Sequence, residues 1–157
     1  AQTMADRIFV MKDGEIIQVG TPTEIYTRAN SPFIADFIGI MNFIPATIGK
    51  NNQAHCNSVI IDCDTQDFQN NQSVRLAIRP EDIQLNVEKS DNNALEATIK
   101  EIEFLGSFQR IYLEVSNVTK DLIMADMPSS NARKINLALN DKLNICFPVE
   151  DIRVYPN

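Results

Sequence analysis

An internal repeat constrains the fold of this chain more than any other feature of its sequence. Residues 45–48 (PATI) begin a block that reaches residues 78–85, and residues 96–99 (EATI) begin a second block that reaches residues 147–154. Both blocks start on Ala-Thr-Ile and end on Glu-Asp-Ile, with one residue inserted in the match. Because self-similarity of this kind indicates one structural unit used twice, we expect two related small β units.

Short runs in which apolar and polar residues alternate follow one another from about residue 42 onwards. Residues 74–79 (VRLAIR) and 110–115 (RIYLEV) place large apolar side chains at every second position, which is typical of strands with one face on a core and one in water. The candidate strands are residues 44–48, 58–62, 74–78, 83–87, 95–104, 110–115, 121–125 and 143–147. Turn-rich stretches separate them at residues 50–53, 65–72, 90–93 and 129–131. This part of the chain is therefore predicted to be mainly β.

The first forty residues follow a different pattern. Two apolar runs within residues 8–19 are joined by residues 12–15 (KDGE), and an Asp-Gly pair favours a tight hairpin turn. Residues 21–24 (TPTE) supply a capping hydroxyl, a proline and a glutamate for a helix over residues 22–28. Ser31 and the following proline start a second helix that ends at Gly39. We expect a hairpin and two helices, with a domain boundary near residues 39–41.

Several motifs in this order resemble one known family. Residues 5–11 (ADRIFVM), 20–26 (GTPTEIY) and 33–39 (FIADFIG) resemble the C-terminal edge of the ATPase subunit of bacterial ABC importers of the sugar, polyamine, ferric-iron and phosphonate type. Residues 78–83 (IRPEDI) and 103–107 (EFLGS) resemble the TOBE module, an OB-type β-barrel that follows the ATPase domain in these importers. The resemblance implies a truncated end of a nucleotide-binding domain over residues 1–40. It implies a TOBE accessory domain, a composite barrel pair, over residues 41–157.

The residues that bind and hydrolyse ATP in that family lie upstream of these motifs. No GxxxxGK[ST] sequence occurs in the chain, and its glycines, at 14, 20, 39, 49 and 106, are scattered. We therefore expect no catalytic residue, no cofactor and no metal in this chain, and ATP with Mg in the parent protein.

The resemblance also implies partners. The parent would be a homodimeric ATPase that docks on permease subunits at the inner, cytoplasmic face of the cell membrane. Its cargo would be delivered by a periplasmic solute-binding protein. The resemblance fits phosphonate, polyamine, iron and sugar importers alike, so it names no cargo. The expected roles of the chain itself are dimer association through the β domain and coupling of ATP hydrolysis to uptake.

Charge and hydropathy patterning argue against two classes of partner. The formal net charge is −7, which opposes the phosphate backbone of nucleic acids. No run of about 18 apolar residues is present, so direct membrane insertion is not expected. OB barrels can bind oligonucleotides through aromatic side chains in a basic groove, but here Phe104, Phe108 and Tyr112 alternate with glutamates. A nucleic-acid-binding OB protein is the least favoured alternative.

Arg79, Glu81 and Gly106 are the candidate regulatory or interdomain residues. Pro80 removes a hydrogen-bond donor from a strand, so the simplest interpretation of this segment is a turn. The functional hypothesis is that Arg79 and Glu81 face the ATPase domain or a partner subunit and report its conformational state. Gly106 favours a bulge or a positive φ, with close approach of a ligand as the alternative.

Two further groups of residues suggest small ligands. TOBE-like modules in some relatives bind oxyanions such as molybdate, and residues 129–134 (SSNARK) offer hydroxyls, an amide and two cations. Their order does not reproduce the Ser-Ala-Arg-Asn pattern of molybdate modules, so the expected structure is a solvated loop. His55, Cys56 and Cys63 match no closed zinc spacing, and the cysteines are expected to be small core residues. An oxyanion-sensing module remains the main alternative function.

Overall fold

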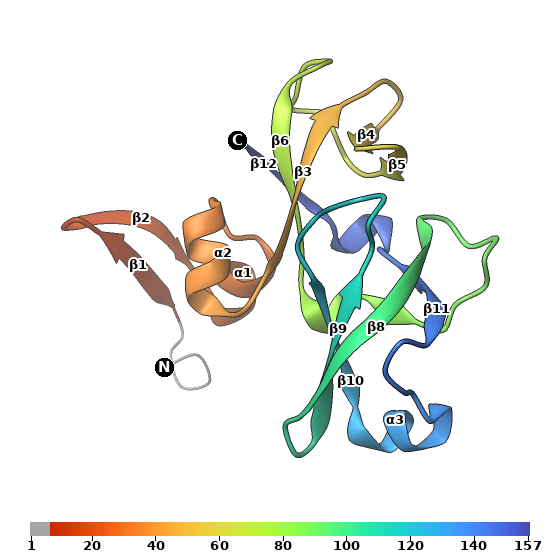
Figure 1. Ribbon diagram of the computed structural model, residues 1–157. Coiled ribbons are helices and arrows are strands. Elements are labelled where there is room, and N and C mark those ends of the chain that lie inside the picture. The colour runs from red at the N-terminus through yellow and green to blue at the C-terminus, as the bar shows by residue number, and fades with distance from the viewer. Residues whose placement is uncertain (1–6) are drawn as a thin grey trace. The chain divides into compact units, whose positions relative to one another are not determined.

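The structure, a computed structural model, describes residues 7–157 (Figure 1). Residues 1–6, with the start of the ADRIFVM motif, lie outside the described residues. The chain divides into two compact units, Ala1–Met41 and Asn42–Asn157. The division falls one residue after the boundary expected from the sequence. None of the described helices is both long and apolar enough to cross a membrane.

The first unit is a hairpin followed by two short helices. Its elements are β1 (Ile8–Lys12), β2 (Glu15–Gly20), α1 (Pro22–Thr27) and α2 (Pro32–Ile38). Asp13 and Gly14 have φ values of 52° and 81°, and two consecutive positive φ angles make the turn type whose twist matches a β-hairpin.

Side-chain caps start both helices. The Thr21 side chain accepts a hydrogen bond from the Glu24 amide, and the Glu24 carboxylate accepts one from the Thr21 amide. These two contacts complete the capping box that the sequence predicts. The Ser31 hydroxyl caps α2 by accepting from the amide of Ile34.

The second unit consists of two five-stranded antiparallel sheets. The first sheet has the order β12-β6-β3-β4-β5, and the second has the order β10-β9-β8-β11-β7. The strands are β3 (Asn42–Ile48), β4 (Gln53–Cys56), β5 (Val59–Asp62), β6 (Ser73–Ile78), β7 (Gln84–Leu85), β8 (Ala94–Phe104), β9 (Phe108–Glu114), β10 (Ile123–Pro128), β11 (Lys142–Cys146) and β12 (Arg153–Pro156). The other elements are the 3₁₀ turns η1 (Pro80–Asp82) and η2 (Val149–Asp151) and helix α3 (Ser129–Ile135).

The two sheets exchange their last strands. After β6, η1 carries the chain to β7, which pairs with β11 of the second sheet; after β11, η2 carries the chain to β12, which pairs with β6 of the first sheet (Figure 1). The two pairings are equivalent under the sequence repeat, because Arg153 faces Ala77 just as Gln84 faces Cys146. Each repeat therefore completes the sheet of the other.

One hydrophobic core joins the two sheets. Ile44 and Leu76 from the first sheet and Ile99 and Leu113 from the second belong to the same buried cluster, and Phe147 is 1% exposed within it. Burial of large aliphatic and aromatic side chains is the main favourable term in folding. Exchange of strands and a shared core make the second unit one folded body rather than two independent repeats.

Three elements differ from the sequence-based expectation. Strand β4 includes Gln53, which the sequence assigns to a turn, and β12 is not among the expected strands. Both have only 4 residues, and pairing within the sheet decides them. Residues 129–131, expected to be a loop, begin helix α3. Its Ala, Arg and Lys residues favour helix, Ser129 and Ala132 are buried, and Asn136 ends it with a left-handed φ of 59°.

Candidate functional site

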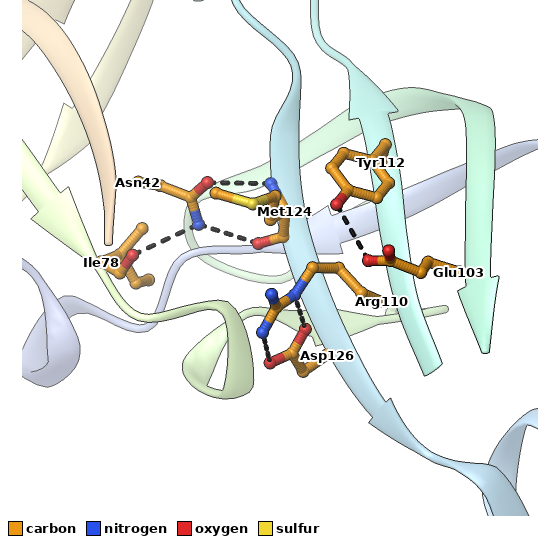
Figure 2. A network of polar contacts seen from close by, with 7 residues as sticks. All are labelled: Asn42, Ile78, Glu103, Arg110, Tyr112, Met124 and Asp126. Carbon is orange, nitrogen blue, oxygen red and sulfur yellow. Dashed lines mark hydrogen bonds and ion pairs between the residues drawn. The ribbon is translucent and has the colours of Figure 1, made fainter. Parts of the chain in front are cut away.

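Arg110 and Asp126 form a two-bond ion pair on the outer face of the second sheet (Figure 2). They face each other across β9 and β10. Arg110 Nε donates to Asp126 Oδ1 at 2.8 Å, and Nη2 donates to Oδ2 at 2.9 Å. Each side chain is 14% exposed. The hydrogen bond with Asp126 is the largest cause that raises the pKa of Arg110. A planar, partly buried fork of this kind fixes both side chains.

The network continues along the same face. The Tyr112 hydroxyl donates to Glu103 Oε1 at 3.1 Å, linking β9 to β8 (Figure 2). Glu81 in η1 is close enough for its titration to depend on the ion pair, and η1 packs against β10. Although Glu81 is an exposed residue, partial desolvation is the largest cause that raises its pKa; the charge of Asp126 also raises that pKa, and the charge of Arg110 lowers it.

The other two predicted residues lie elsewhere. Arg79 is only 4% exposed, and its carbonyl accepts the hydrogen bond from the Asp82 amide that closes η1, at 3.0 Å. The charge of Arg79 lowers the pKa of Asp82 and of Tyr155, and the charge of Asp82 in turn raises the pKa of Glu81. The regulatory or interdomain role of Arg79 and Glu81 stays a prediction.

Gly106 is at the tip of the β8–β9 hairpin. Its φ is +83°, which a residue with a Cβ adopts only at a cost. Its carbonyl accepts a hydrogen bond from Ser129 Oγ at 2.6 Å, and the Ser129 amide donates to the Ser107 carbonyl. The turn is thus fastened to the start of α3. This geometry accounts for the glycine, and it uses the hydroxyl of Ser129 that the sequence offered to an oxyanion.

Asn42, the first residue of the second unit, binds the free edge of β10. Its Oδ1 accepts from the Met124 amide and its Nδ2 donates to the Met124 carbonyl, both at 2.8 Å, and Nδ2 also reaches the Ile78 carbonyl at 3.3 Å (Figure 2). Asn42 is 5% exposed. A carboxamide presents the same donor and acceptor pair as a peptide group, so it takes the place of a neighbouring strand here.

The residues considered for a metal do not converge. Cys56 and Cys63 are buried in the core, whereas His55 lies on the exposed face of β4. Burial is the largest cause that raises the pKa of Cys56 to about 12 and that of Cys63 to about 11, from 9.0. A thiol with so high a pKa is a poor nucleophile and a poor metal ligand. Among the described residues, no group of three or more His, Cys, Asp or Glu side chains could hold a metal ion.

A polar hollow of 460 Å³ lies at the end of the first sheet where β3 turns into β4. The residues that line it are Thr47, Ile48, Gly49, Lys50, Gln53, His55, Asn70 and Asn71. Lys50 and His55 are its basic side chains, and no carboxylate lines it. The His55 ring lies so close to Gly49 that a Cβ at this position would be 2.6 Å from Nε2. The hollow therefore offers hydrogen-bond donors to an anion.

A comparison with protein families identifies the family of the second unit. The TOBE domain family matches residues 76–154, which include the end of β6, the whole second sheet and the crossover through η2. The chain belongs to this family. The sequence resemblance of residues 78–83 and 103–107 to a TOBE module is thereby confirmed.

Curated proteins similar to this TOBE-containing chain are ATP-binding subunits of importers. The Fe(3+) ions import ATP-binding protein FbpC 2 of Rhizobium meliloti is 33% identical over 99% of this chain and 42% of its own length. The alpha-glucoside transport ATP-binding protein AglK of the same organism is 40% identical over 82% of this chain and 37% of its own length. The spermidine/putrescine import ATP-binding protein PotA of Aster yellows witches'-broom phytoplasma is 29% identical over 98% of this chain and 34% of its own length.

These matches confirm the resemblance to ABC importer ATP-binding subunits. They include the first unit as well as the TOBE domain, since two of them cover nearly the whole chain. The chain spans about two fifths of the length of the first two relatives.

A solved structure supports the fold of the TOBE domain. The cytoplasmic molybdate-binding protein ModG, with molybdate bound, superposes with a TM-score of 0.61 over 83% of this chain and 99% of that chain, at 10% sequence identity. At this identity the likeness shows the fold alone. The expected class, mainly β with an OB-like barrel pair, is confirmed.

Sequence reasoning missed most of the polar network. Arg110 and Asp126 come from strands joined by a long turn, and no local pattern pairs them. Asn42 lies outside the expected strand 44–48, whereas it is the first residue of β3 in the structure. The available signal was its polar side chain directly before the alternating run of β3, where a buried asparagine needs partners.

Proposed function

We propose that this chain is the accessory and regulatory region of the ATPase subunit of an ABC importer. Its roles are association of two subunits and coupling of ATP hydrolysis to solute uptake, while hydrolysis itself occurs in the part of the longer protein that the chain does not contain. The observation that carries this proposal is the similarity to import ATP-binding proteins across both units, at 33% identity over 99% of the chain.

An uncovered apolar surface on the first unit supports the same proposal. Phe9, Met11 and Ile16 are 57%, 57% and 56% exposed. Met11 faces Ile16 across the hairpin, and Phe9 faces Val19, so the four side chains share one face of β1 and β2. Contiguous exposed apolar surface marks an interaction site. We assign this hairpin face to packing against the rest of the ATPase domain.

The parent protein follows from this assignment. It binds ATP with Mg, works as a homodimer, and docks on permease subunits at the cytoplasmic face of the membrane through its ATPase domain. The TOBE domain contributes the dimer contact. The names of the relatives range over ferric iron, alpha-glucosides and spermidine/putrescine, so the cargo is left open.

Sedimentation velocity of the purified chain tests where the dimer forms. We expect a dimer, and we expect the double variant Met11→Gln and Ile16→Gln to remain dimeric, because its changes lie on the hairpin and not on the TOBE domain. The matched control is Leu122→Gln and Leu139→Gln, exposed apolar residues of the second unit. A monomer at high micromolar concentration, or a dimer abolished by the hairpin changes alone, would contradict association through the TOBE domain.

A phosphate-release assay tests the absence of chemistry. The purified chain with ATP and Mg should release no phosphate above the rate in buffer, because it contains no phosphate-binding loop. Hydrolysis that follows the protein through successive purification steps would refute this part of the proposal.

Oxyanion sensing is the second candidate function. The hollow lined by Lys50, Gln53 and His55 provides donors without a competing carboxylate, and the fold is shared with a molybdate-binding protein. Isothermal titration calorimetry against molybdate, tungstate, sulfate and a phosphonate would detect binding. Saturable heat that is lost in Lys50→Gln would favour this function over a purely structural role, and the absence of heat for all four anions would exclude it.

A further inference from the structure

A second hollow lies over the outer face of β8. It measures 380 Å³, which falls within the range of small-molecule sites. Its lining residues are Val59, Leu95, Glu96, Thr98, Lys100, Glu114, Val115, Ser116, Asn117 and Lys142. The hollow thus draws on β5 of the first sheet and on β8, β9 and β11 of the second. It shares no lining residue with the hollow of the oxyanion alternative.

Four charged side chains surround Thr98 in this hollow. Thr98 faces Glu114 on β9 and Lys142 on β11, while Glu96 and Lys100 precede and follow it by two residues on β8. In a strand, residues two apart lie on one face, and directly opposite residues on neighbouring strands lie beside them. The five side chains therefore form a cross with Thr98 at its centre.

The order of charges around this cross is not alternating. Glu96 and Glu114 occupy adjacent arms, and Lys100 and Lys142 occupy the other two adjacent arms. One corner of the hollow is consequently negative and the opposite corner is positive. A ligand with an ammonium group and a carboxylate group matches both corners at once, whereas a simple anion or cation meets a like charge on the other side.

A β-bulge sets the position of Lys100. The register between β8 and β9 shifts between Ile99 and Glu101, so Lys100 is the extra residue. Bulges re-aim side chains and occur next to functional sites. Lys100 Nζ lies 3.9 Å from Glu114 Oε1, beyond hydrogen-bond distance. In the part of the chain that the structure describes, Glu96 and Lys142 form no ion pair with each other. The hydrogen-bonding capacity of these charges is thus available to a ligand.

The rim of the hollow is fastened between the two sheets. Asn57, in the β4–β5 turn, donates from Nδ2 to the Val118 carbonyl at 3.1 Å. The turn that carries Ser116 and Asn117 is closed by hydrogen bonds from Val118 and Thr119 to the Val115 carbonyl. Because these hydrogen bonds hold both turns at the rim in place, the hollow is formed before any ligand enters. This lowers the entropic cost of binding.

The neutral lining defines the ligand class. The apolar part of the lining is small, because Val59, Leu95 and Val115 belong to the hydrophobic core or pack against it. No aromatic ring lines the hollow against which a sugar could stack. We propose that this hollow binds a small zwitterion, namely a free α-amino acid with a short aliphatic side chain. Its ammonium group lies between Glu96 and Glu114, and its carboxylate lies between Lys100 and Lys142. The site does not depend on the proposed accessory role, and its failure would leave that role untouched.

Backbone amide chemical shifts of the ¹⁵N-labelled chain provide the test. The probe is L-valine, compared with 3-methylbutanoate, which lacks the ammonium group, and isobutylamine, which lacks the carboxylate. We expect saturable shifts at Thr98, Lys100 and Ser116 with valine, and at least about tenfold weaker binding of each analogue, because each loses one pair of charge-assisted hydrogen bonds. Amides of the Lys50 and His55 hollow should not move.

Charge-neutral variants complete the test. Glu96→Gln and Lys142→Gln should each weaken valine binding by about tenfold or more, and both residues are exposed, so the fold is retained. Glu88→Gln and Lys134→Gln, exposed charges outside the hollow, should leave the affinity unchanged. No saturable shift with valine, equal binding of either analogue, stronger binding of glucose or spermidine, or unchanged affinity in Lys142→Gln would each overturn the proposal.

Discussion

At the scale of single residues, Asn42 has the most consequential contacts. It is the first residue after the division between the units, and its carboxamide binds the backbone of Met124 on the edge strand β10 as well as the Ile78 carbonyl. An unprotected strand edge invites pairing with another chain. Asn42 thus blocks one position of the β10 edge while it ties the first sheet to the second.

Replacement of Asn42 by alanine should destabilise the second unit by about 2 kcal/mol, because the partly buried amide and carbonyl of Met124 lose their partners. Urea denaturation monitored by circular dichroism measures this change. Asn70→Ala, at an exposed asparagine, is the matched control and should change the free energy of unfolding by less than about 0.5 kcal/mol. Equal effects of the two variants would show that the Asn42 contacts contribute nothing.

The buried thiols give a second residue-scale prediction. Burial raises the pKa of Cys63 from 9.0 to about 11, so its thiolate fraction at pH 8 falls by roughly a hundredfold relative to an ordinary cysteine. Iodoacetamide should modify Cys56 and Cys63 only after unfolding, as peptide mapping would reveal. Because their folded-state pKa values are raised, the stability they contribute is lost as the pH rises from 9 through 11 to 12. Rapid labelling of the native chain at pH 8 would disprove this account.

At the scale of elements, the paired 3₁₀ turns η1 and η2 are where the two repeats cross. Each carries an aspartate at its last position, Asp82 and Asp151. Desolvation is the largest cause that raises the pKa of both carboxyl groups, and the charge of Asp151 raises the pKa of Asp82 further. Arg153 offsets part of this effect for both. The crossover therefore brings two equivalent carboxylates together, and this lowers the free energy of unfolding by an amount that depends on pH.

Substitution of Asp82 by asparagine should reveal that cost. A carboxyl whose folded-state pKa is raised favours the folded state below its ordinary pKa of 3.8, and this contribution is lost as the pH rises through the raised value. Asp82→Asn should therefore be at least as stable as the parent chain at pH 7, and the two should converge at pH 3. Urea midpoints at both pH values measure this. The direction of the pKa shift would be contradicted if the stability of the variant relative to the parent were lower at pH 7 than at pH 3. Asp67→Asn, at an exposed aspartate, is the control.

At the scale of the whole second unit, strand exchange couples the two sheets. β12 completes the first sheet and β7 completes the second, and one core runs between them. Neither sheet can open fully without breaking pairs that belong to the other repeat. We expect a single cooperative unfolding transition for this unit.

Ile145→Ala tests that coupling, because Ile145 is fully buried on β11 of the second sheet. The loss should be about 2–5 kcal/mol. Native-state hydrogen exchange should then show the same decrease in protection for β3 and β6 amides in the first sheet as for β8 and β9 amides in the second. A decrease confined to the second sheet would mean that the two sheets unfold separately.

Local chemistry was enough to predict much of this molecule. Asp13-Gly14 predicts the hairpin turn, Thr21 with Glu24 predicts the capping box, and alternating residues locate most strands, because each signal is contained within a few neighbouring residues. The repeat predicts two related units, and the importer motifs predict the family that the comparisons confirmed.

Long-range packing sets how those parts combine. Turns, caps and strand alternation can be predicted from neighbouring residues, because backbone sterics and the burial of alternate side chains act over a few residues. The family can be predicted from its motifs. Strand exchange through η1 and η2, the Arg110–Asp126 pair and the charge cross around Thr98 join residues far apart in the chain. Such contacts form because the two sheets share one core, and packing free energy, rather than any local pattern, selects the partners.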